Sequence, residues 1–319
     1  MAFDLLPSLR PRVRHGVVRV HVARKWEFHG GTDDGPITHL DLVLVDEKGN
    51  SMYGEIPIEE VERKSPLLEE GGVYVIRRFR VSNAKATFMP MPGNYIIEFT
   101  YYTLIEPVVD NAVSIPHLVY HLTPFGDLAQ RAGIYSRFTD IIGVLVEVSE
   151  TKVVHPSGKA VPTITRDITI RDLSYSEMKV TLWGNRASAF TLDGVYDPNE
   201  AKPIIVLLVG TLAKNYQGQV YLSANAACRW YFNPEILEAN PFYSRYKICF
   251  IATHGTAEAE MVCFGDVAGR IVGKPFQQVM RATRPSEDFP PDIAAIVSLR
   301  FTFAIVLTDQ SFDKPDKSF

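Results

Sequence analysis

Alternation of apolar and polar residues dominates the first 110 positions of the chain and predicts a run of β-strands. A turn that ends in Gly49 separates two apolar runs, which is the pattern of a β-hairpin. A short acidic helix or loop is expected over Ile58–Glu70, where Pro66 interrupts it. The strands predicted here are Gly16–Phe28, His39–Asp46, Ser51–Ile56, Val73–Val81 and Tyr95–Ile105.

The same order of elements recurs roughly 110 residues later, and such a repeat predicts two similar modules. A helix precedes the second set over Phe125–Ala132, and another, capped by Asn185, is expected over Asn185–Leu192. The strands predicted in this set are Thr139–Glu150, Thr163–Asp172, Glu177–Trp183, Ile204–Leu212 and Gln219–Ala224. Three strands, a helix and two strands is the order of the OB-fold, a small five-stranded Greek-key barrel.

Residues 236–319 give only part of such a pattern. Strands are predicted over Tyr246–Thr253, Glu260–Phe264 and Leu299–Thr308, with a helix over Asp266–Arg281. The fold class expected is therefore all-β with short helices: two tandem OB-fold barrels and a partial third OB-like unit. The division predicted is a first OB-fold over 1–110, a linker over 111–123, a second OB-fold over 124–235 and the partial segment over 236–319.

Composition excludes several classes of protein. The chain has 319 residues, of which 46% are hydrophobic and 22% charged, as in ordinary globular proteins. Its most apolar run, Ile204–Val209, is far shorter than a membrane-spanning helix, and no secretory signal is expected at the N-terminus. The 3 cysteines lie far apart, so neither a disulfide framework nor a cysteine zinc site is predicted.

The sequence carries no nucleotide-binding loop, nucleophile elbow or zinc-protease motif, so we expect neither an enzyme nor a small-molecule substrate, cofactor or metal. The formal net charge is −4, and no segment has a strong basic excess. A generic polyanion binder usually carries positive charge. Any contact with nucleic acid must therefore depend on where individual side chains lie.

The strand that ends at Trp183 provides the clearest candidate site. Strand alternation places Val180 and Leu182 on one face and Lys179 and Trp183 on the other. The apolar pair predicts the core, so the indole and the ammonium share the outer face, where they could stack a base and hold a phosphate. The alternative is that Trp183 covers the barrel end or packs on a neighbouring domain.

Tyr216 lies in a polar hairpin tip, where an aromatic ring has no core to enter. In an OB-fold that hairpin lies across the binding groove, so Tyr216 could stack on a second base. A tyrosine laid on the barrel surface is the alternative. Arg166 and Arg171 flank a strand nearby and are candidates for phosphate contact or for exposed salt bridges.

The corresponding hairpin of the first module carries basic residues and one aromatic residue. Its candidates are Arg77, Arg78, Arg80, Lys85 and Phe88. Arg78 and Arg80 share a strand face, and Phe88 follows the turn, where it could stack or plug the barrel. Trp26 has the parity of the core valines of its strand, so it is expected in the core unless a bulge intervenes, whereas Lys25 has the outward parity.

At this point the residues resemble the large subunit of replication protein A. In the second module the matching strings are Phe138–Gly143, Val180–Asn185 with Ala187 and Phe190, and Asn233–Ile236 with Glu238 and Ala239. In the first they are Leu44–Gly49 and Gly71–Tyr74, with Arg24–Trp26 resembling plant members of the family. The match spans residues 3–240 and rests on the ordered series of strings.

The resemblance implies single-stranded DNA binding in replication, repair or recombination, and nuclear residence. Trp183 and Tyr216 fall on the two stacking positions of the family's second domain, and Phe88 on one of the first. Leu40 occupies the other and cannot stack. Lys214 and Arg166 fall where the family places basic groups, and other subunits of this type are further candidate partners.

Residues 236–319 depart from the family. Arg245–Ile248 and Phe264–Ala268 with Gly273 resemble the later half of its third OB domain, while the zinc ribbon and trimerisation helix are missing. We therefore expect no zinc. The alternative function is that of a degenerate paralogue whose OB-folds bind proteins, which the acidic first module and Leu40 favour. The complete set of predicted binding residues is Trp183, Tyr216, Lys214, Arg166, Lys179, Phe88, Arg78, Arg80, Lys85 and Lys25.

Overall fold

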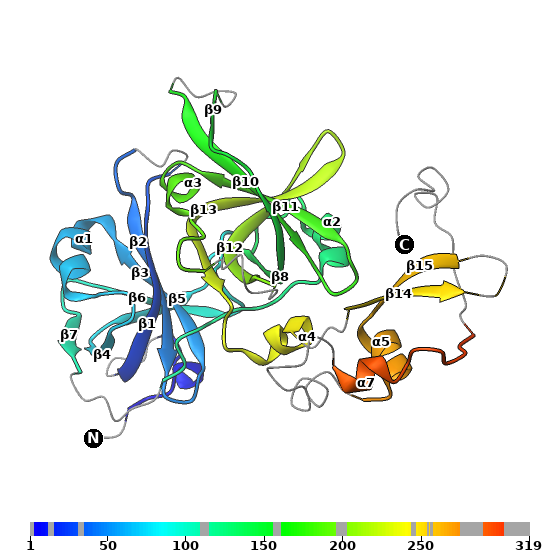
Figure 1. Ribbon diagram of the computed structural model, residues 1–319. Coiled ribbons are helices and arrows are strands. Elements are labelled where there is room, and N and C mark those ends of the chain that lie inside the picture. The colour runs from blue at the N-terminus through cyan, green and yellow to red at the C-terminus, as the bar shows by residue number, and fades with distance from the viewer. Residues whose placement is uncertain are drawn as a thin grey trace. The chain divides into compact units, whose positions relative to one another are not determined.

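The computed structural model describes residues 3–11, 16–30, 35–108, 115–155, 161–195, 203–243, 247–253, 255, 258–274 and 290–302. The chain forms two compact units, Met1–Glu235 and Ile236–Phe319. The first unit contains two curled β-sheets (Figure 1). The prediction of a mostly β protein built from OB-folds is confirmed.

The first sheet curls around a core of apolar side chains that includes Val18, Val20, Leu40, Leu42 and Ile97. Its strands lie in the order β5-β6-β3-β2-β1-β4-β7, and α1 and a 3-10 turn follow β3. The elements are β1 (Val17–Phe28), β2 (His39–Asp46), β3 (Ser51–Pro57), α1 (Ile58–Lys64), β4 (Val73–Arg77), β5 (Arg80–Asn83), β6 (Tyr95–Glu98) and β7 (Leu104–Pro107).

Two of the strands predicted in the first module are each split in two, so their expected continuity is wrong. The first breaks at Arg78, whose backbone has a φ of 59°. The carbonyl of Arg78 accepts hydrogen bonds from the hydroxyls of Thr100 (3.4 Å) and Thr103 (3.2 Å), which lie where the second strand breaks. The halves β4 and β5 lie toward opposite ends of the sheet order, so the break is the corner that lets the barrel curl.

The second sheet is closed, because β11 pairs with both β10 and β13 in the order β11-β13-β12-β8-β10. Its core includes Ile168, Val180, Leu182, Phe190 and Leu222. The elements are α2 (Leu128–Arg131), β8 (Thr139–Val148), β9 (Lys152–Val154), β10 (Thr163–Arg171), β11 (Glu177–Trp183), α3 (Asn185–Ala189), β12 (Ile205–Tyr216) and β13 (Gln219–Phe232).

The helix cap predicted at Asn185 is wrong by one residue. Gly184, with a φ of 56°, occupies the cap position, and no side chain bonds there. Only glycine adopts this turn at little cost, so it links β11 directly to α3.

An apolar cluster joins the two barrels within the first unit. It consists of Ala23, Trp26, Val43, Val45, Met91, Ile115, Phe138 and Ala227. A bulge in β1 between Val22 and Arg24 reverses the alternation of the strand, so Trp26 points out of its own barrel and into this cluster. The parity-based placement of Trp26 in the barrel core is therefore wrong, and the bulge is the reason.

The second unit contains the hairpin of β14 (Lys247–Thr253) and β15 (Glu258–Phe264), with α5 (Gly265–Val272) packed near it. The short helices α4 (Asn240–Tyr243) and α7 (Pro291–Ala294) complete it. Both predicted strands of the hairpin are found, whereas residues 299–302 form no strand. Residues 275–281 of the predicted helix and 303–308 of the predicted strand lie outside the described residues.

No helix in the described part of the chain combines the length and apolar character that a membrane crossing needs.

Candidate nucleic-acid interface

The outer face of the second barrel brings Trp183 and Tyr216 to the same side. Val180 and Leu182 are fully buried, so the opposite parity of β11 faces outward. The indole Nε1 of Trp183 donates a hydrogen bond to Ser223 Oγ at 3.1 Å. Ser223 lies on the face of β13 whose cross-strand partners include Lys214 and Tyr216 of β12. The two rings therefore lie on one outer surface, which we call the Trp183 face.

Tyr216 is the most exposed ring of this face, with 66% of its surface in contact with solvent. It ends β12, and the turn that follows uses positive φ angles at Gln217 (51°) and Gly218 (84°). The Gly218 amide donates to Asn215 Oδ1 at 3.0 Å, which fixes the turn. The hairpin of β12 and β13 extends from the barrel (Figure 1). The phenol is thus displayed on a rigid ribbon with no core beside it.

A single carboxylate holds the lysines of the Trp183 face. Asp167 forms ion pairs with Lys152 (2.8 Å) and Lys179 (2.9 Å) and accepts a hydrogen bond from Thr181 (2.8 Å). Burial alone would raise the pKa of Asp167, but the hydrogen bonds from Lys152, Lys179 and Thr181 outweigh it and lower the pKa. Both lysines are more than half exposed, so a phosphate can compete for them.

Replacing Asp167 with asparagine is expected to strengthen the binding of a single-stranded oligonucleotide. The amide keeps the volume of the side chain but no longer neutralises Lys152 and Lys179. The slope of log affinity against log salt should steepen by about 0.7 for each lysine that then contacts a phosphate. Fluorescence anisotropy at several salt concentrations measures both quantities. Glu177→Gln, which releases Arg171 at the far end of β11, is the matched control. Unchanged affinity and slope in Asp167→Asn would contradict the prediction.

Other predicted basic residues of the second barrel are placed differently. Arg166 pairs across the strands with Leu182, so its side chain lies on the face opposite Trp183. There its guanidinium donates to the carbonyl of Phe190. Lys214 is half-buried beside Tyr216 on the Trp183 face. The structure therefore brings together Trp183, Tyr216, Lys214 and Lys179 but not Arg166.

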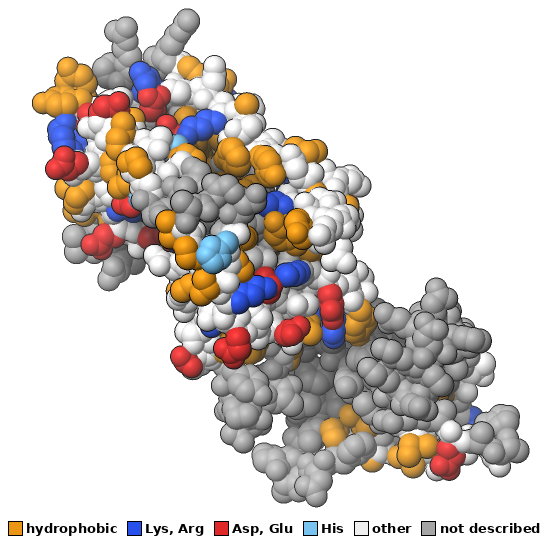
Figure 2. Space-filling model, turned by 90° about the horizontal axis from the view of Figure 1, so that it is seen from above, with side chains coloured by type: hydrophobic (Ala, Val, Ile, Leu, Met, Phe, Trp, Pro, Cys, Tyr) orange, Lys and Arg blue, Asp and Glu red, His pale blue; other side chains and the backbone are white. Residues whose placement is uncertain are grey.

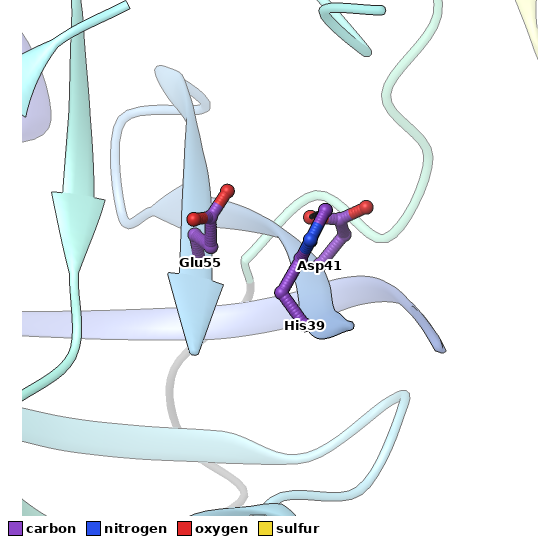
Figure 3. A group of neighbouring side chains, drawn as sticks. All are labelled: His39, Asp41 and Glu55. Carbon is purple, nitrogen blue, oxygen red and sulfur yellow. Dashed lines mark ion pairs between the residues drawn. The ribbon is translucent and has the colours of Figure 1, made fainter. Parts of the chain in front are cut away.

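The outer face of β2 and β3 in the first barrel carries a cluster of charged residues (Figure 3). His39 and Asp41 come from β2, and Glu55 comes from β3, with their ligand atoms within 4.8 Å of one another. Asp41 and Glu55 lie directly opposite across the strands, an arrangement that repels like charges. The Lys85 ammonium forms an ion pair with Glu55 and lies 3.0 Å from the hydroxyl of Tyr53. These five residues form the acidic cluster.

The acidic cluster has its own cation, because Lys85 occupies the place where a metal ion would bind. The Tyr53 hydroxyl lies within hydrogen-bond distance of both carboxylates, and burial together with Asp41 and Glu55 raises its pKa. The strands β2 and β3 form the face on which OB-folds receive ligands. In this barrel that face presents carboxylates, and no broad patch of one charge is visible among the described side chains in Figure 2.

The remaining predicted residues of the first barrel are mostly engaged within the chain. Arg80 forms an ion pair with Glu98. The Lys25 ammonium donates to the carbonyls of Ser65 (2.8 Å) and Leu68 (2.7 Å), and burial lowers its pKa. Arg78 is exposed, and its side chain has no ion pair among the described residues.

The two candidate stacking positions of the first barrel differ from each other. Leu40 is fully buried in the barrel core, so this position offers no surface to a base. Phe88 is 46% exposed, and its ring stacks on that of Tyr135, with centroids 5.7 Å apart and planes 10° from parallel. Of the two positions, only Phe88 therefore presents a ring to solvent.

Sequence reasoning missed three features of this surface. The hairpin register could have revealed the pairing of Asp41 with Glu55, because the turn at Gly49 fixes it. Tyr221 has the same parity as Ser223 on β13, so alternation alone could have placed it on the Trp183 face. No local signal identifies Tyr135, whose partner Phe88 belongs to the other barrel.

Two docked OB barrels, the second with two aromatic rings on one outer face, define a tandem OB-fold protein. Comparison with known families agrees with this class. Residues 7–130 match the domain of unknown function DUF223, and residues 135–230 match the replication protein A OB domain. A solved chain from a replication protein A heterotrimer bound to ssDNA shares the fold, with a TM-score of 0.51 and 17% identity over 92% of this chain and 88% of that one.

Curated relatives are similar along most of the chain. "Replication factor A protein 1" of Schizosaccharomyces pombe is 28% identical over 240 residues, which are 74% of this chain and 37% of that protein. The "Replication protein A 70 kDa DNA-binding subunit" of Drosophila melanogaster is 27% identical over 244 residues, 74% of this chain and 38% of its own length. A plant relative of the same name, from Arabidopsis thaliana, is 24% identical over 251 residues, 76% of this chain and 28% of its own length.

The chain is therefore a relative of the large subunit of replication protein A, and it spans less than two fifths of the length of these relatives.

Proposed function

We propose that the chain binds single-stranded DNA by stacking unpaired bases on Trp183 and Tyr216 while Lys179 and Lys214 contact the phosphates. The observation that carries the proposal is that both rings lie on one outward face of the second barrel. Stacking tolerates any sequence because every base has a π-face. The relatives are named as DNA-binding subunits, which supports this reading over an enzymatic one.

By the same relationship, we propose a role in DNA replication, repair or recombination in the nucleus, with other subunits of the replication protein A type as candidate partners. The boundaries 1–110, 111–123, 124–235 and 236–319 remain part of this proposal. So do the roles of Phe88, Arg78, Arg80, Lys85, Lys25 and Arg166 in binding. Several of these cations would first have to exchange an internal partner for a phosphate.

A salt titration tests the proposal. A fluorescently labelled single strand of about 30 nucleotides is titrated with the full chain, and anisotropy is followed at increasing salt. We expect saturable binding at low salt that weakens as salt rises, since each phosphate contact releases counterions. Absence of binding at low salt would overturn the proposal.

The second candidate function is that of a protein-binding module. The acidic cluster favours it for the first barrel, because carboxylates at 41 and 55 repel a phosphate backbone. A chain that ignores DNA at low salt would support this alternative.

A further inference from the structure

A backbone clasp joins the loop between β5 and β6 of the first barrel to the segment that enters the second. The Phe88 amide donates to the Tyr135 carbonyl at 2.6 Å, and the Met89 amide donates to the Ser136 carbonyl at 3.2 Å. The Phe138 amide returns a bond to the Met89 carbonyl at 2.9 Å. Met89 and Phe138 are buried, so the clasp is anchored on its inner side.

The outer side of the clasp displays two aromatic rings. Phe88 and Tyr135 are stacked nearly parallel, with exposed fractions of 46% and 36%. Phe88 holds a φ of 58°, which is unfavourable for a residue other than glycine. The bonds of the clasp fix this conformation, and its effect is to direct the ring onto Tyr135 rather than into either core.

The pair continues into the rings of the second barrel. Tyr221 follows the turn after Tyr216, and it lies two residues before Ser223, which holds the Trp183 indole. Burial raises the pKa of Tyr221, and the hydroxyls of Tyr135 and Tyr216 raise it further. The phenol of Tyr221 thus lies within electrostatic reach of both, and the row Phe88, Tyr135, Tyr221, Tyr216 runs from one barrel to the other.

A basic side chain accompanies the step between the barrels. Arg137 lies in a β-bridge with Met89 and is half-buried, and it has no ion pair among the described residues. Its positive charge is felt nearby, because it helps to lower the pKa of both His121 and Arg131 after burial has done so. An unneutralised guanidinium beside two exposed rings suits a phosphate next to a stacked base.

We propose that Tyr135, stacked on Phe88, is a further base-stacking residue that carries an unpaired strand from the second barrel to the first. The inference rests on the proposed function and deepens it. It predicts that one strand contacts both barrels through this step. The ring that the resemblance would require in place of Leu40 is not needed, because Tyr135 supplies the second ring beside Phe88.

The test compares Tyr135→Ala with the parent on strands of two lengths. A strand of about 30 nucleotides reaches both barrels, whereas one of about 8 occupies a single OB site. Loss of one stack should weaken the binding of the long strand about 5- to 100-fold and leave that of the short strand within about twofold. Tyr135→Phe should bind like the parent, since it keeps the ring. Tyr102→Ala, which removes an exposed tyrosine between β6 and β7, is the matched control.

Two further measurements separate stacking from a structural role. Tyr135→Leu keeps an apolar side chain without a π-face and should lose the long strand as Tyr135→Ala does. Ultraviolet crosslinking of a strand of about 30 nucleotides that contains 5-iodouracil should attach it to the peptide that contains Tyr135. Parent-like binding of the long strand by both the alanine and leucine variants would overturn the inference while leaving the proposed function intact. Failure of the parent to bind either strand would overturn the proposed function and the inference with it.

Discussion

Replacing Trp183 and Tyr216 together with alanine is expected to weaken the binding of a single strand of about 30 nucleotides by about 30-fold at least. Each base stacked on an aromatic ring contributes roughly 1–3 kcal/mol, so two stacks amount to about 2–6 kcal/mol. Both rings lie on the outer face, and neither belongs to the core cluster of the barrel, so their loss should leave the fold intact. Anisotropy at one fixed salt concentration measures the effect.

The salt dependence provides a second test of this variant. Neither substitution removes a cation, so the slope of log affinity against log salt should match that of the parent while the affinity falls. Tyr102→Ala, whose tyrosine is 69% exposed against 66% for Tyr216, is a control of equal exposure on the first barrel. Parent-like affinity of the double variant would remove the stacking mechanism.

Replacing Asp140 with alanine is expected to lower the free energy of unfolding of the first unit by about 3–5 kcal/mol. Asp140 is 2% exposed and accepts hydrogen bonds from the amides of Gly210 and His121, each at 2.8 Å. Burial raises its pKa, and the nearby charge of Arg24 opposes that rise. Arg24 is 1% exposed, and its guanidinium has no hydrogen-bond partner among the described residues. Removing the carboxylate leaves that cation buried without compensation.

Chemical denaturation followed by tryptophan fluorescence measures this change. Arg24→Met in the Asp140→Ala background should restore part of the loss, because the uncompensated charge is then gone and an apolar side chain fills its place. Asp172→Ala, which affects an exposed turn carboxylate of the second barrel, should cost about 1 kcal/mol or less. An Asp140→Ala protein with the denaturation midpoint of the parent would contradict the prediction.

Alternation along a single strand was sufficient to place Trp183. Val180 and Leu182 have no polar atoms to satisfy, so they enter the core and direct Trp183 outward. The order of strands and the position of the helix likewise follow from local patterns, since each depends on neighbours close in sequence. The turn at 217–218 similarly fixes Tyr216 at a hairpin tip.

What local patterns could not supply is set by residues distant in sequence. The bulge that reverses Trp26 depends on the pairing of β1 with β2, and no residue type in Ala23–Lys25 marks it. The pairing of Lys179 with Asp167 depends on which residues lie across β10 and β11. The internal partners of Lys25, Arg80 and Lys85 follow from the folded chain in the same way. Residue type predicts that a side chain is cationic, but not that it is already neutralised.

The cluster around Trp26 has a consequence for the thermodynamics of recognition. Its buried side chains and the bonds of Arg229 to Lys25 and Glu70 hold the two barrels in one orientation before any strand arrives. Two domains on a loose tether lose rotational freedom when a common ligand aligns them. Here that alignment is completed during folding, so the spacing between successive stacking rings is a built-in ruler for the strand, and affinity should depend sharply on strand length rather than on tether length.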